Sequence, residues 1–293
     1  MMDEHLNSLL AMYFPGAKLR QHEKLEGGVS ANVTLLDVQL ETSAMTRLVL
    51  REHGASHCGH PAALEFELLR SLYSLGLAVP EPIAWGNADG ADRHPFTLLR
   101  YIEGSTDIPA SAVEKHIRVM AEQLVAIHGS RTDTLPALPS RSDPRPELLD
   151  FLPPEAEWHR LRDHVARMEF SAFSGEPVLL HGDYWPKNLI WQNEKLVGII
   201  DWEDAALGDP LSDVACACLE LSYLYGDWGS RVFLDAYREN KQVAPMRFAL
   251  WQAYVAAAGN RSMGNWGLDP ERERSMRQVA TASIRNAASA LGA

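Results

Sequence analysis

The sequence is poor in cysteine, in basic charge and in long apolar runs, and each shortage excludes a class of protein. Three cysteines in 293 residues are too few for a disulfide framework and favour a reducing compartment. With 27 basic against 39 acidic residues the net charge is −12, which argues against a nucleic-acid partner. No apolar run approaches the roughly 20 residues that a membrane-spanning helix needs. We therefore expect a cytoplasmic protein with no nucleic-acid and no membrane partner.

The composition supports a folded protein of substantial size. Hydrophobic residues make up 46% of the chain, which is ordinary for a globular protein and does not favour disorder. A chain of 293 residues can bury the core of one large domain or of two lobes. The first residues are acidic where a signal peptide would be basic, so no secretory leader is expected.

The most informative stretch follows a short apolar run, Val178–Leu180, which is typical of a buried strand. Two further apolar runs, Leu189–Trp191 and Leu196–Ile200, are separated by four polar residues and predict an antiparallel hairpin. Asn188 begins the first arm of that hairpin and Asp201 follows the second. Both residues should therefore lie at the same end of the hairpin.

Asp183 follows the first of these strands, so we expect it to converge with Asn188 and Asp201. One interpretation is turn chemistry, because Asp and Asn commonly bond their own backbone in loops. The other is a magnesium–phosphate site, because Mg²⁺ prefers oxygen ligands. Kinases carry an Asp-x4-Asn loop followed by a metal-binding Asp at a strand end, and this spacing favours the second interpretation. We predict Asp183 as the catalytic base and Asn188 and Asp201 as metal ligands.

Three motifs together resemble the aminoglycoside phosphotransferase/choline kinase-like family, which is similar to protein kinases in fold. They are His181-Gly182-Asp183-x4-Asn188, Ile200-Asp201-Trp202 and Gly208-Asp209-Pro210-x2-Asp213. The resemblance implies an α+β, two-lobed fold with an antiparallel-sheet lobe at 1–104 and a mainly helical lobe at 105–293 that carries the catalytic hairpin. It also implies Mg²⁺ and ATP, or GTP, between the lobes, and transfer of the γ-phosphate to a hydroxyl of a small substrate by a monomer or homodimer.

The resemblance assigns three nucleotide-binding side chains to the first lobe. Ser30 follows Gly27-Gly28 and would approach the phosphates, although Gly-Gly alone is typical of an ordinary turn. Arg51 ends a predicted strand where a kinase carries Lys; the alternative is a surface arginine on an exposed strand face. Glu65, on a helix predicted from Pro61 to Leu75, would pair with Arg51 or be a solvated helix charge.

The resemblance also places a hinge after a strand predicted from Phe96 to Ile102. The backbone groups of Arg100 and Ile102 would bind adenine there. Beyond the hinge the chain is predicted to be mainly helical, with one helix from Leu211 to Tyr225. Asp213 would either cap this helix or brace the catalytic loop.

Three rival functions remain open. Arg51 and the modest Gly-Gly loop are compatible with a nucleotide-binding pseudokinase or regulatory protein. His181 beside Asp183 is compatible with a metal-dependent hydrolase, whereas the kinase analogy makes His181 a scaffold for the loop. A scaffold protein would not need polar residues clustered at strand ends. The acceptor is not identified by the sequence, because fold does not fix substrate.

Overall fold

The computed structural model describes residues 2–25, 31–54, 59–87, 94–168 and 173–293. The chain forms two compact units, each built from three separate stretches. Unit 1 comprises Met1–Ser105, Thr134–Pro136 and Ile190–Glu203, and unit 2 comprises Thr106–Asp133, Ala137–Leu189 and Asp204–Ala293. The sequence predicted a single boundary near residue 104, so the return of 190–203 to unit 1 is a difference from that prediction.

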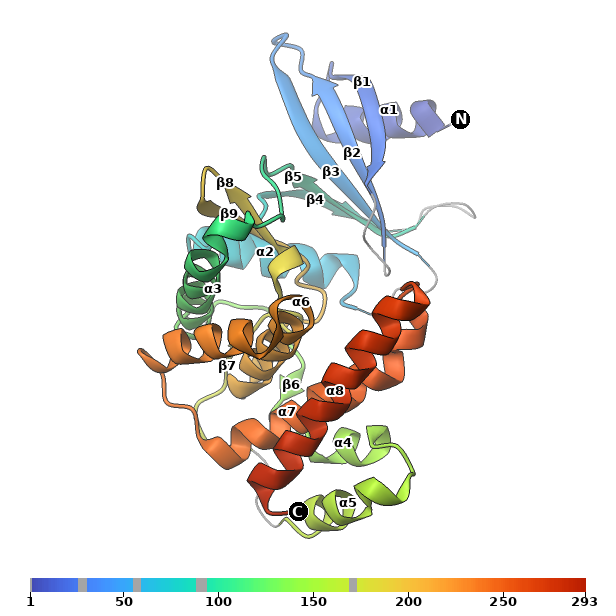
Figure 1. The fold of residues 1–293 in the computed structure, drawn as a ribbon. Helices are drawn as coiled ribbons and strands as arrows, with labels where there is room; N and C mark the ends of the chain where they lie inside the picture. The colour runs from blue at the N-terminus through green and yellow to red at the C-terminus, as the bar shows by residue number, and fades with distance from the viewer. Residues whose placement is uncertain (1, 26–30, 55–58, 88–93, 169–172) are drawn as a thin grey trace. The chain divides into compact units, whose positions relative to one another are not determined.

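Unit 1 contains a five-stranded sheet in the order β1-β2-β3-β5-β4, in which every neighbouring pair is antiparallel (Figure 1). Leu36 and Val38 of β2, Leu48 and Leu50 of β3 and Leu98 of β5 belong to one buried core, and the two-residue spacing within β2 and β3 places each pair on one face of the sheet. The strands are β1 (Lys18–Leu25), β2 (Ala31–Gln39), β3 (Met45–His53), β4 (Pro82–Gly86) and β5 (Phe96–Arg100).

Within the residues that the structure describes, two helices belong to this unit. α1 (Met2–Tyr13) buries Leu6, Leu9 and Leu10 in a core shared with the sheet. α2 (Ala62–Ser74) contacts β4 and β5 and ends close to the predicted Leu75, before Gly76 at φ 78°. Glu65 lies among the buried residues of α2 and is only 1% exposed. A fully buried glutamate demands a charged or hydrogen-bonded partner.

The predicted hairpin is confirmed as β8 (Leu189–Gln192) and β9 (Lys195–Ile199). Its turn residues Asn193 and Glu194 both have positive φ, 50° and 60°, as a tight hairpin turn requires. Backbone hydrogen bonds tie the hairpin into unit 1. Ser105 and Trp191 exchange N–H···O bonds of 2.9 and 2.8 Å, and Ile199 N donates to Ala78 O at 2.6 Å. These bonds are the physical reason why the hairpin groups with unit 1.

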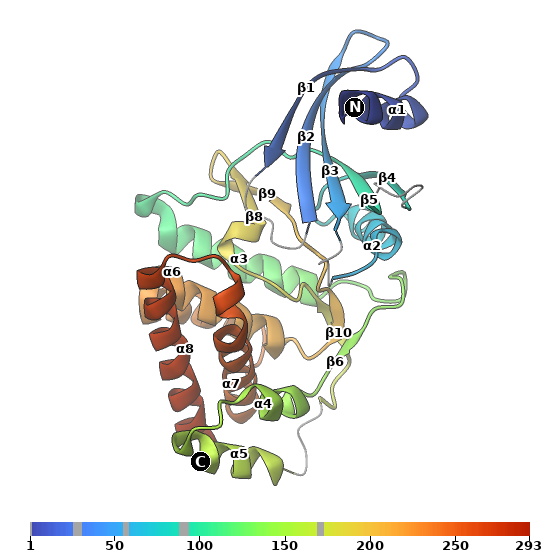
Figure 2. The same cartoon turned by 90° about the vertical axis from the view of Figure 1, so that its right-hand side faces the viewer.

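Unit 2 is mainly helical, with a small sheet in the order β6-β10-β7. The three longest helices, α6, α7 and α8, lie side by side (Figure 2). The helices of unit 2 are α3 (Val113–His128), α4 (Arg145–Phe151), α5 (His159–Ala166), α6 (Leu211–Arg238), α7 (Pro245–Ser262) and α8 (Pro270–Leu291). Its short 3₁₀ turns are η1 (Ala110–Ala112), η2 (Ala156–Trp158), η3 (Pro186–Asn188) and η4 (Met263–Asn265). Its strands are β6 (Ser140–Arg141), β7 (Val178–Leu180) and β10 (Ala206–Gly208).

α6 extends well beyond the predicted end at Tyr225. It reaches Arg238 through a kink at Gly226, whose φ of 65° and ψ of −169° are not helical. Glycine adopts this conformation without steric cost, so the helix changes direction there and continues. Within the described ranges, no helix combines the length and the apolarity that crossing a bilayer requires.

Candidate active site

The predicted catalytic loop begins directly after β7 with His181, Gly182 and Asp183. Gly182 has φ 91°, and a Cβ at this position would lie 2.1 Å from Asp204 O. No side chain fits there, so the glycine of the motif is required by close backbone approach. His181 is fully buried, and Asp183 N donates to His181 Nδ1 at 3.3 Å. The predicted scaffold role of His181 is therefore confirmed, and its burial disfavours a hydrolase built on this imidazole.

Asp213, near the start of α6, braces this loop from within the core. Its carboxylate accepts hydrogen bonds from His181 N at 2.7 Å and from Gly182 N at 3.0 Å. The alternative prediction, that Asp213 caps the helix, is wrong, because the cap position is Pro210 and no side chain bonds there. Bonding to loop backbone satisfies N–H groups that burial would otherwise leave unpaired.

The charge of Asp213 is stabilised although the side chain is fully buried. His128 Nε2 lies 3.3 Å from Asp213 Oδ2, and His128 Nδ1 lies 2.8 Å from Tyr237 Oη. Burial raises the pKa of Asp213, but the hydrogen bond and charge of His128, with help from His181, outweigh burial and hold the pKa below its usual value. The brace is thus an ionised carboxylate.

Asn188 lies in η3, immediately before β8, and its carboxamide faces Asp183. Asn188 Nδ2 donates to Asp183 O at 2.9 Å and to Asp183 Oδ2 at 3.1 Å. These bonds orient the Asp183 carboxylate. They also use the nitrogen end of the Asn188 carboxamide, which leaves its oxygen end as the one suited to a cation.

In unit 1, Arg51 is surrounded by carboxylates. Its Nη1 lies 3.0 Å from Glu65 Oε1 and 2.9 Å from Asp201 Oδ1, and its Nη2 bonds to Glu203. The ion pair between Arg51 and Glu65 was expected from the sequence and is present. Burial alone would lower the pKa of Arg51, but Glu65, Asp201 and Glu203 together raise it. The guanidinium therefore stays charged, and it is not the surface arginine of the alternative interpretation.

Asp201 belongs to unit 1 whereas Asp183 and Asn188 belong to unit 2, so the convergence of all three stays a prediction. Asp201 has φ 68°, a left-handed conformation that is uncommon outside glycine. Strained backbone of this kind clusters at functional sites. Its side chain is one-third exposed, and its carboxylate is a suitable oxygen ligand for magnesium.

Sequence reasoning missed His53. Its Nε2 lies 2.9 Å from Glu65 Oε2, so Glu65 is held by His53 and Arg51 together. A signal was present, because residues two apart on a strand share a face and His53 follows Arg51 by two positions on β3. Sequence reasoning also missed the side chain of Glu203 as a partner of Arg51.

The two predicted hinge residues, Arg100 and Ile102, lie at the end of β5 and just beyond it. β5 ends at Arg100, two residues short of the predicted end of this strand. Arg100 N donates to Glu81 O at 2.9 Å, so this N–H group is already used within the sheet. Ile102 lies just beyond, half-buried, with its Cδ1 near the backbone of Gly198. Ser30 lies outside the described residues.

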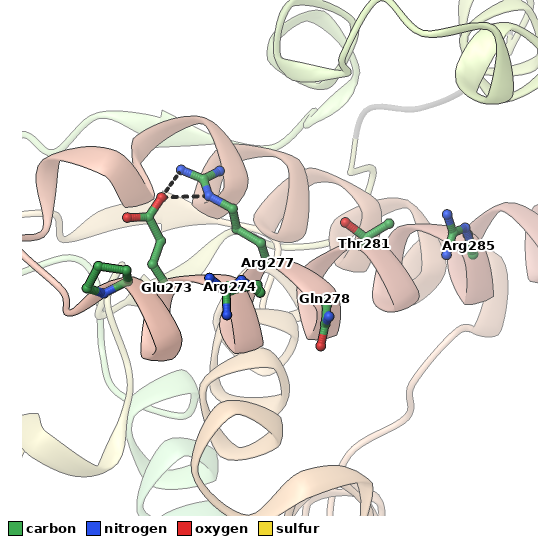
Figure 3. A pocket seen from close by; sticks show the side chains of 7 residues that line it. Glu273, Arg274, Arg277, Gln278, Thr281 and Arg285 are labelled. Atoms are coloured by element: carbon green, nitrogen blue, oxygen red, sulfur yellow. Dashed lines mark hydrogen bonds and ion pairs between the residues drawn. The ribbon is translucent and has the colours of Figure 1, made fainter.

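A shallow pocket of about 570 Å³ lies along α8 and is lined by residues from Pro270 to Arg285 (Figure 3). In it, Arg277 turns back toward Glu273, with Nε 2.8 Å from Oε1. The pocket does not contain Asp183 or Asn188. We interpret it as a solvated, charge-paired helix face.

Comparison with known proteins identifies the family of this chain. Residues 24–253 match the phosphotransferase enzyme family. The chain belongs to this family. It is 25% identical over 224 residues to viomycin phosphotransferase of Streptomyces vinaceus, covering 65% of this chain and 74% of that protein. It is also 26% identical over 254 residues to acyl-CoA dehydrogenase family member 10 of Mus musculus, covering 74% of this chain but only 22% of that longer protein.

Solved structures of phosphotransferases share the fold. The GDP complex of aminoglycoside 2'-phosphotransferase-IIIa superimposes with a TM-score of 0.66 at 18% identity, covering 98% of this chain and 99% of that chain. A thermostable aminoglycoside phosphotransferase mutant, in complex with ADP and hygromycin B, gives a TM-score of 0.66 at 16% identity, covering 95% and 97%. The α+β, protein-kinase-like fold expected from the sequence is confirmed.

Proposed function

We propose that this family member is a small-molecule kinase that transfers the γ-phosphate of ATP, or GTP, to a hydroxyl of a small acceptor. The observation that carries the proposal is the oriented carboxylate of Asp183. Asn188 bonds to its Oδ2, and the backbone before it is fixed by the buried, ionised Asp213. A general base must be held in a defined direction toward the proton that it accepts, and this loop supplies that rigidity.

The remaining predicted residues take supporting roles. Arg51, held charged and positioned by Glu65, would bind nucleotide phosphate. Ser30 would also approach the phosphates, and backbone groups of Arg100 and Ile102 would bind adenine. Asp183 would orient the acceptor hydroxyl and accept its proton. The Asn188 carboxamide oxygen and the Asp201 carboxylate fit a magnesium ion, which would neutralise phosphate charge when bound.

The decisive experiment measures nucleotide turnover by purified protein with magnesium and either ATP or GTP. The acceptors are a panel of hydroxyl-bearing metabolites and antibiotics. We expect Asp183→Asn to lower turnover by several orders of magnitude while nucleotide affinity stays nearly unchanged, because the carboxamide cannot accept the proton. Asp163→Asn, an exposed aspartate on α5, is the matched control and should retain turnover. Normal turnover by Asp183→Asn contradicts the assigned role.

A pseudokinase is the second candidate, because Arg51 stands where kinases carry lysine. Arg51 nevertheless pairs with Glu65, as the lysine would. Nucleotide binding without phosphate transfer to any member of the panel would favour the pseudokinase. Turnover without nucleotide, together with tightly bound zinc or manganese, would favour a hydrolase.

A further inference from the structure

α6 folds back on itself, so that its two ends meet at one side chain of α3. His128 of α3 lies 3.3 Å from Asp213 Oδ2 through its Nε2 and 2.8 Å from Tyr237 Oη through its Nδ1. Asp213 and Tyr237 are 24 positions apart on α6, and a straight helix would separate them by about 36 Å. A single imidazole ring joins them instead.

Gly226 is the point at which the helix reverses. Its φ of 65° and ψ of −169° lie in a region that only glycine enters readily, and a Cβ built there would meet nothing within 4 Å. Beyond it the chain runs back beside the first half of the helix, since Cys218 Sγ lies 3.9 Å from Ser230 O. Along a straight helix these two residues would be about 18 Å apart. The requirement for glycine at 226 is therefore conformational and not steric.

The side chains of Tyr237, His128 and Asp213, which we call the Tyr237 relay, are at most 4% exposed, so their polar atoms need partners. An ionised carboxylate can only accept hydrogen bonds, so His128 Nε2 carries a proton toward Asp213. Burial, followed by the charge of Asp213, raises the pKa of Tyr237, so its hydroxyl keeps its proton. A hydroxyl both donates and accepts, so it satisfies His128 Nδ1 whether the imidazole is neutral or charged.

Aromatic packing fixes the ring of Tyr237. Phe233, which is fully buried one turn earlier on α6, stacks on it with ring centroids 6.4 Å apart and 18° between the planes. The His128 ring meets Tyr237 edge-on, with centroids 5.8 Å apart and an interplanar angle of 79°. The hydroxyl therefore points in a defined direction, and it holds the imidazole in one orientation.

We propose that Tyr237 is a positioning residue for catalysis, which acts on the catalytic loop through His128 and Asp213. Its hydroxyl fixes the orientation of His128, and His128 fixes the Asp213 carboxylate that accepts hydrogen bonds from the loop backbone. That loop presents Asp183. The inference rests on the proposed function, since it specifies how the base is held. It also gives the reversal at Gly226 a role, because the reversal brings Tyr237 back to Asp213.

Hydrogen exchange of two backbone amides, followed by NMR, tests the relay without any ligand. The amides of His181 and Gly182 donate to Asp213, so their exchange reports how firmly Asp213 holds the loop. We expect Tyr237→Phe, which removes only the hydroxyl, to speed the exchange of both amides by about tenfold. The hydrogen-bonded amide of Ile199, in unit 1, is the internal reference and should not change. Unchanged exchange at 181 and 182 overturns the proposal.

A double-mutant cycle tests whether Tyr237 acts through His128. His128→Gln retains a donor at the reach of Nε2 and offers no counterpart of Nδ1. We therefore expect Tyr237→Phe to change the exchange of His181 by less than about twofold in the His128→Gln background. An effect in that background as large as in the wild type means that Tyr237 acts by another route, and the relay is wrong. Tyr254→Phe removes a hydroxyl that donates to Glu147 instead, and it is the matched control.

Gly226→Ala tests the reversal without altering a residue of the relay. The alanine Cβ meets no neighbour, so the substitution adds only backbone strain. We expect the exchange of His181 and Gly182 to speed up in this variant. Gly267→Ala, at φ 66° and equally open, is the matched control and should leave both amides protected. Equal protection in the two glycine variants contradicts a role for the reversal.

Turnover separates positioning of the base from folding. With Mg·ATP and the acceptor panel, kanamycin and D-glucose included, we expect Tyr237→Phe to lower kcat about tenfold and to leave each KM within about twofold. The reason is that a misplaced base slows the chemical step and not binding. Tyr254→Phe should match the wild type, and a raised KM with unchanged kcat in Tyr237→Phe overturns the proposal. If the wild type phosphorylates no member of the panel, the proposed function fails, whereas amide exchange still decides the relay.

Discussion

Unit 1 and unit 2 each bury a charge near the predicted chemistry, and they stabilise it in opposite ways. In unit 1 a buried cation, Arg51, is surrounded by the carboxylates of Glu65, Asp201 and Glu203. In unit 2 a buried anion, Asp213, is surrounded by hydrogen-bond donors, two of which are backbone N–H groups of the catalytic loop. The first cluster joins side chains to side chains, and the second joins a side chain to the backbone.

This difference indicates two kinds of task. Side-chain carboxylates around an arginine can exchange partners, so the Arg51 cluster is suited to a group that must also receive phosphate or release a carboxylate to a metal ion. Backbone N–H groups have no alternative positions without moving the loop. The Asp213 cluster is therefore suited to holding the geometry of Asp183 constant.

The largest effect that would test this comparison is expected from Asp213→Ala. The substitution leaves two buried backbone donors and His128 without their common partner, so we expect the free energy of unfolding to fall by about 3–5 kcal/mol. Urea denaturation measures this loss. Asp235→Ala, an exposed aspartate on the same helix, is the control and should change stability by less than about 0.5 kcal/mol. A loss below about 1 kcal/mol for Asp213→Ala would contradict the brace.

A smaller effect is expected from Glu65→Gln in the Arg51 cluster. The carboxamide can still accept a hydrogen bond, but it lacks the negative charge that Glu65 presents to Arg51 and His53. Asp201 and Glu203 remain as partners of Arg51. We expect about 1–3 kcal/mol of lost stability and about tenfold weaker nucleotide binding, measured by denaturation and by titration with ATP. Glu67→Gln, more exposed on the same helix and paired with Arg70, should leave both unchanged. Unaltered nucleotide binding in Glu65→Gln would show that Arg51 needs no positioning.

The smallest effect is a pH dependence that belongs to Asp213. Its pKa is lower in the folded than in the unfolded state, so its stabilisation is present above about pH 4 and is lost as the pH falls further. Each unit of lowering corresponds to about 1.4 kcal/mol. Unfolding followed from pH 6 to pH 3 should therefore show a steeper loss for the wild type than for Asp213→Asn, which does not titrate. If stability falls equally with pH in the wild type and in Asp213→Asn, the pKa of Asp213 is not lowered by folding and the prediction is wrong.

Much of the candidate site could be predicted because its signals are local in the sequence. The hairpin was predicted from two apolar runs and a polar turn, and β8 and β9 confirm it. Gly182 was predicted as part of a motif, and the approach of Asp204 O explains why no other residue fits. The pairing of Arg51 with Glu65 was implied by the resemblance to the family, and the structure contains it.

What could not be predicted depends on contacts between residues far apart in the sequence. His128 reaches Asp213 from a helix 85 positions away, and no local pattern marks either as the partner of the other. The kink at Gly226 is equally hidden, because a glycine after an amphipathic run is typical of a helix end. The sequence also placed the hairpin with the helical lobe, whereas backbone bonds from Ser105 and Ala78 tie most of it to unit 1.

The order of apolar runs, glycines and acidic residues by itself determined the family, the α+β fold and the identity of the residues expected to act on phosphate, because strand endings and motif spacing are properties of neighbouring positions. Only the tertiary structure decided which charges are buried and what faces them. Asp213 became a brace through its burial and through His128, a partner that folding brings from another helix. Protonation and orientation depend on that three-dimensional environment, and no stretch of sequence contains it.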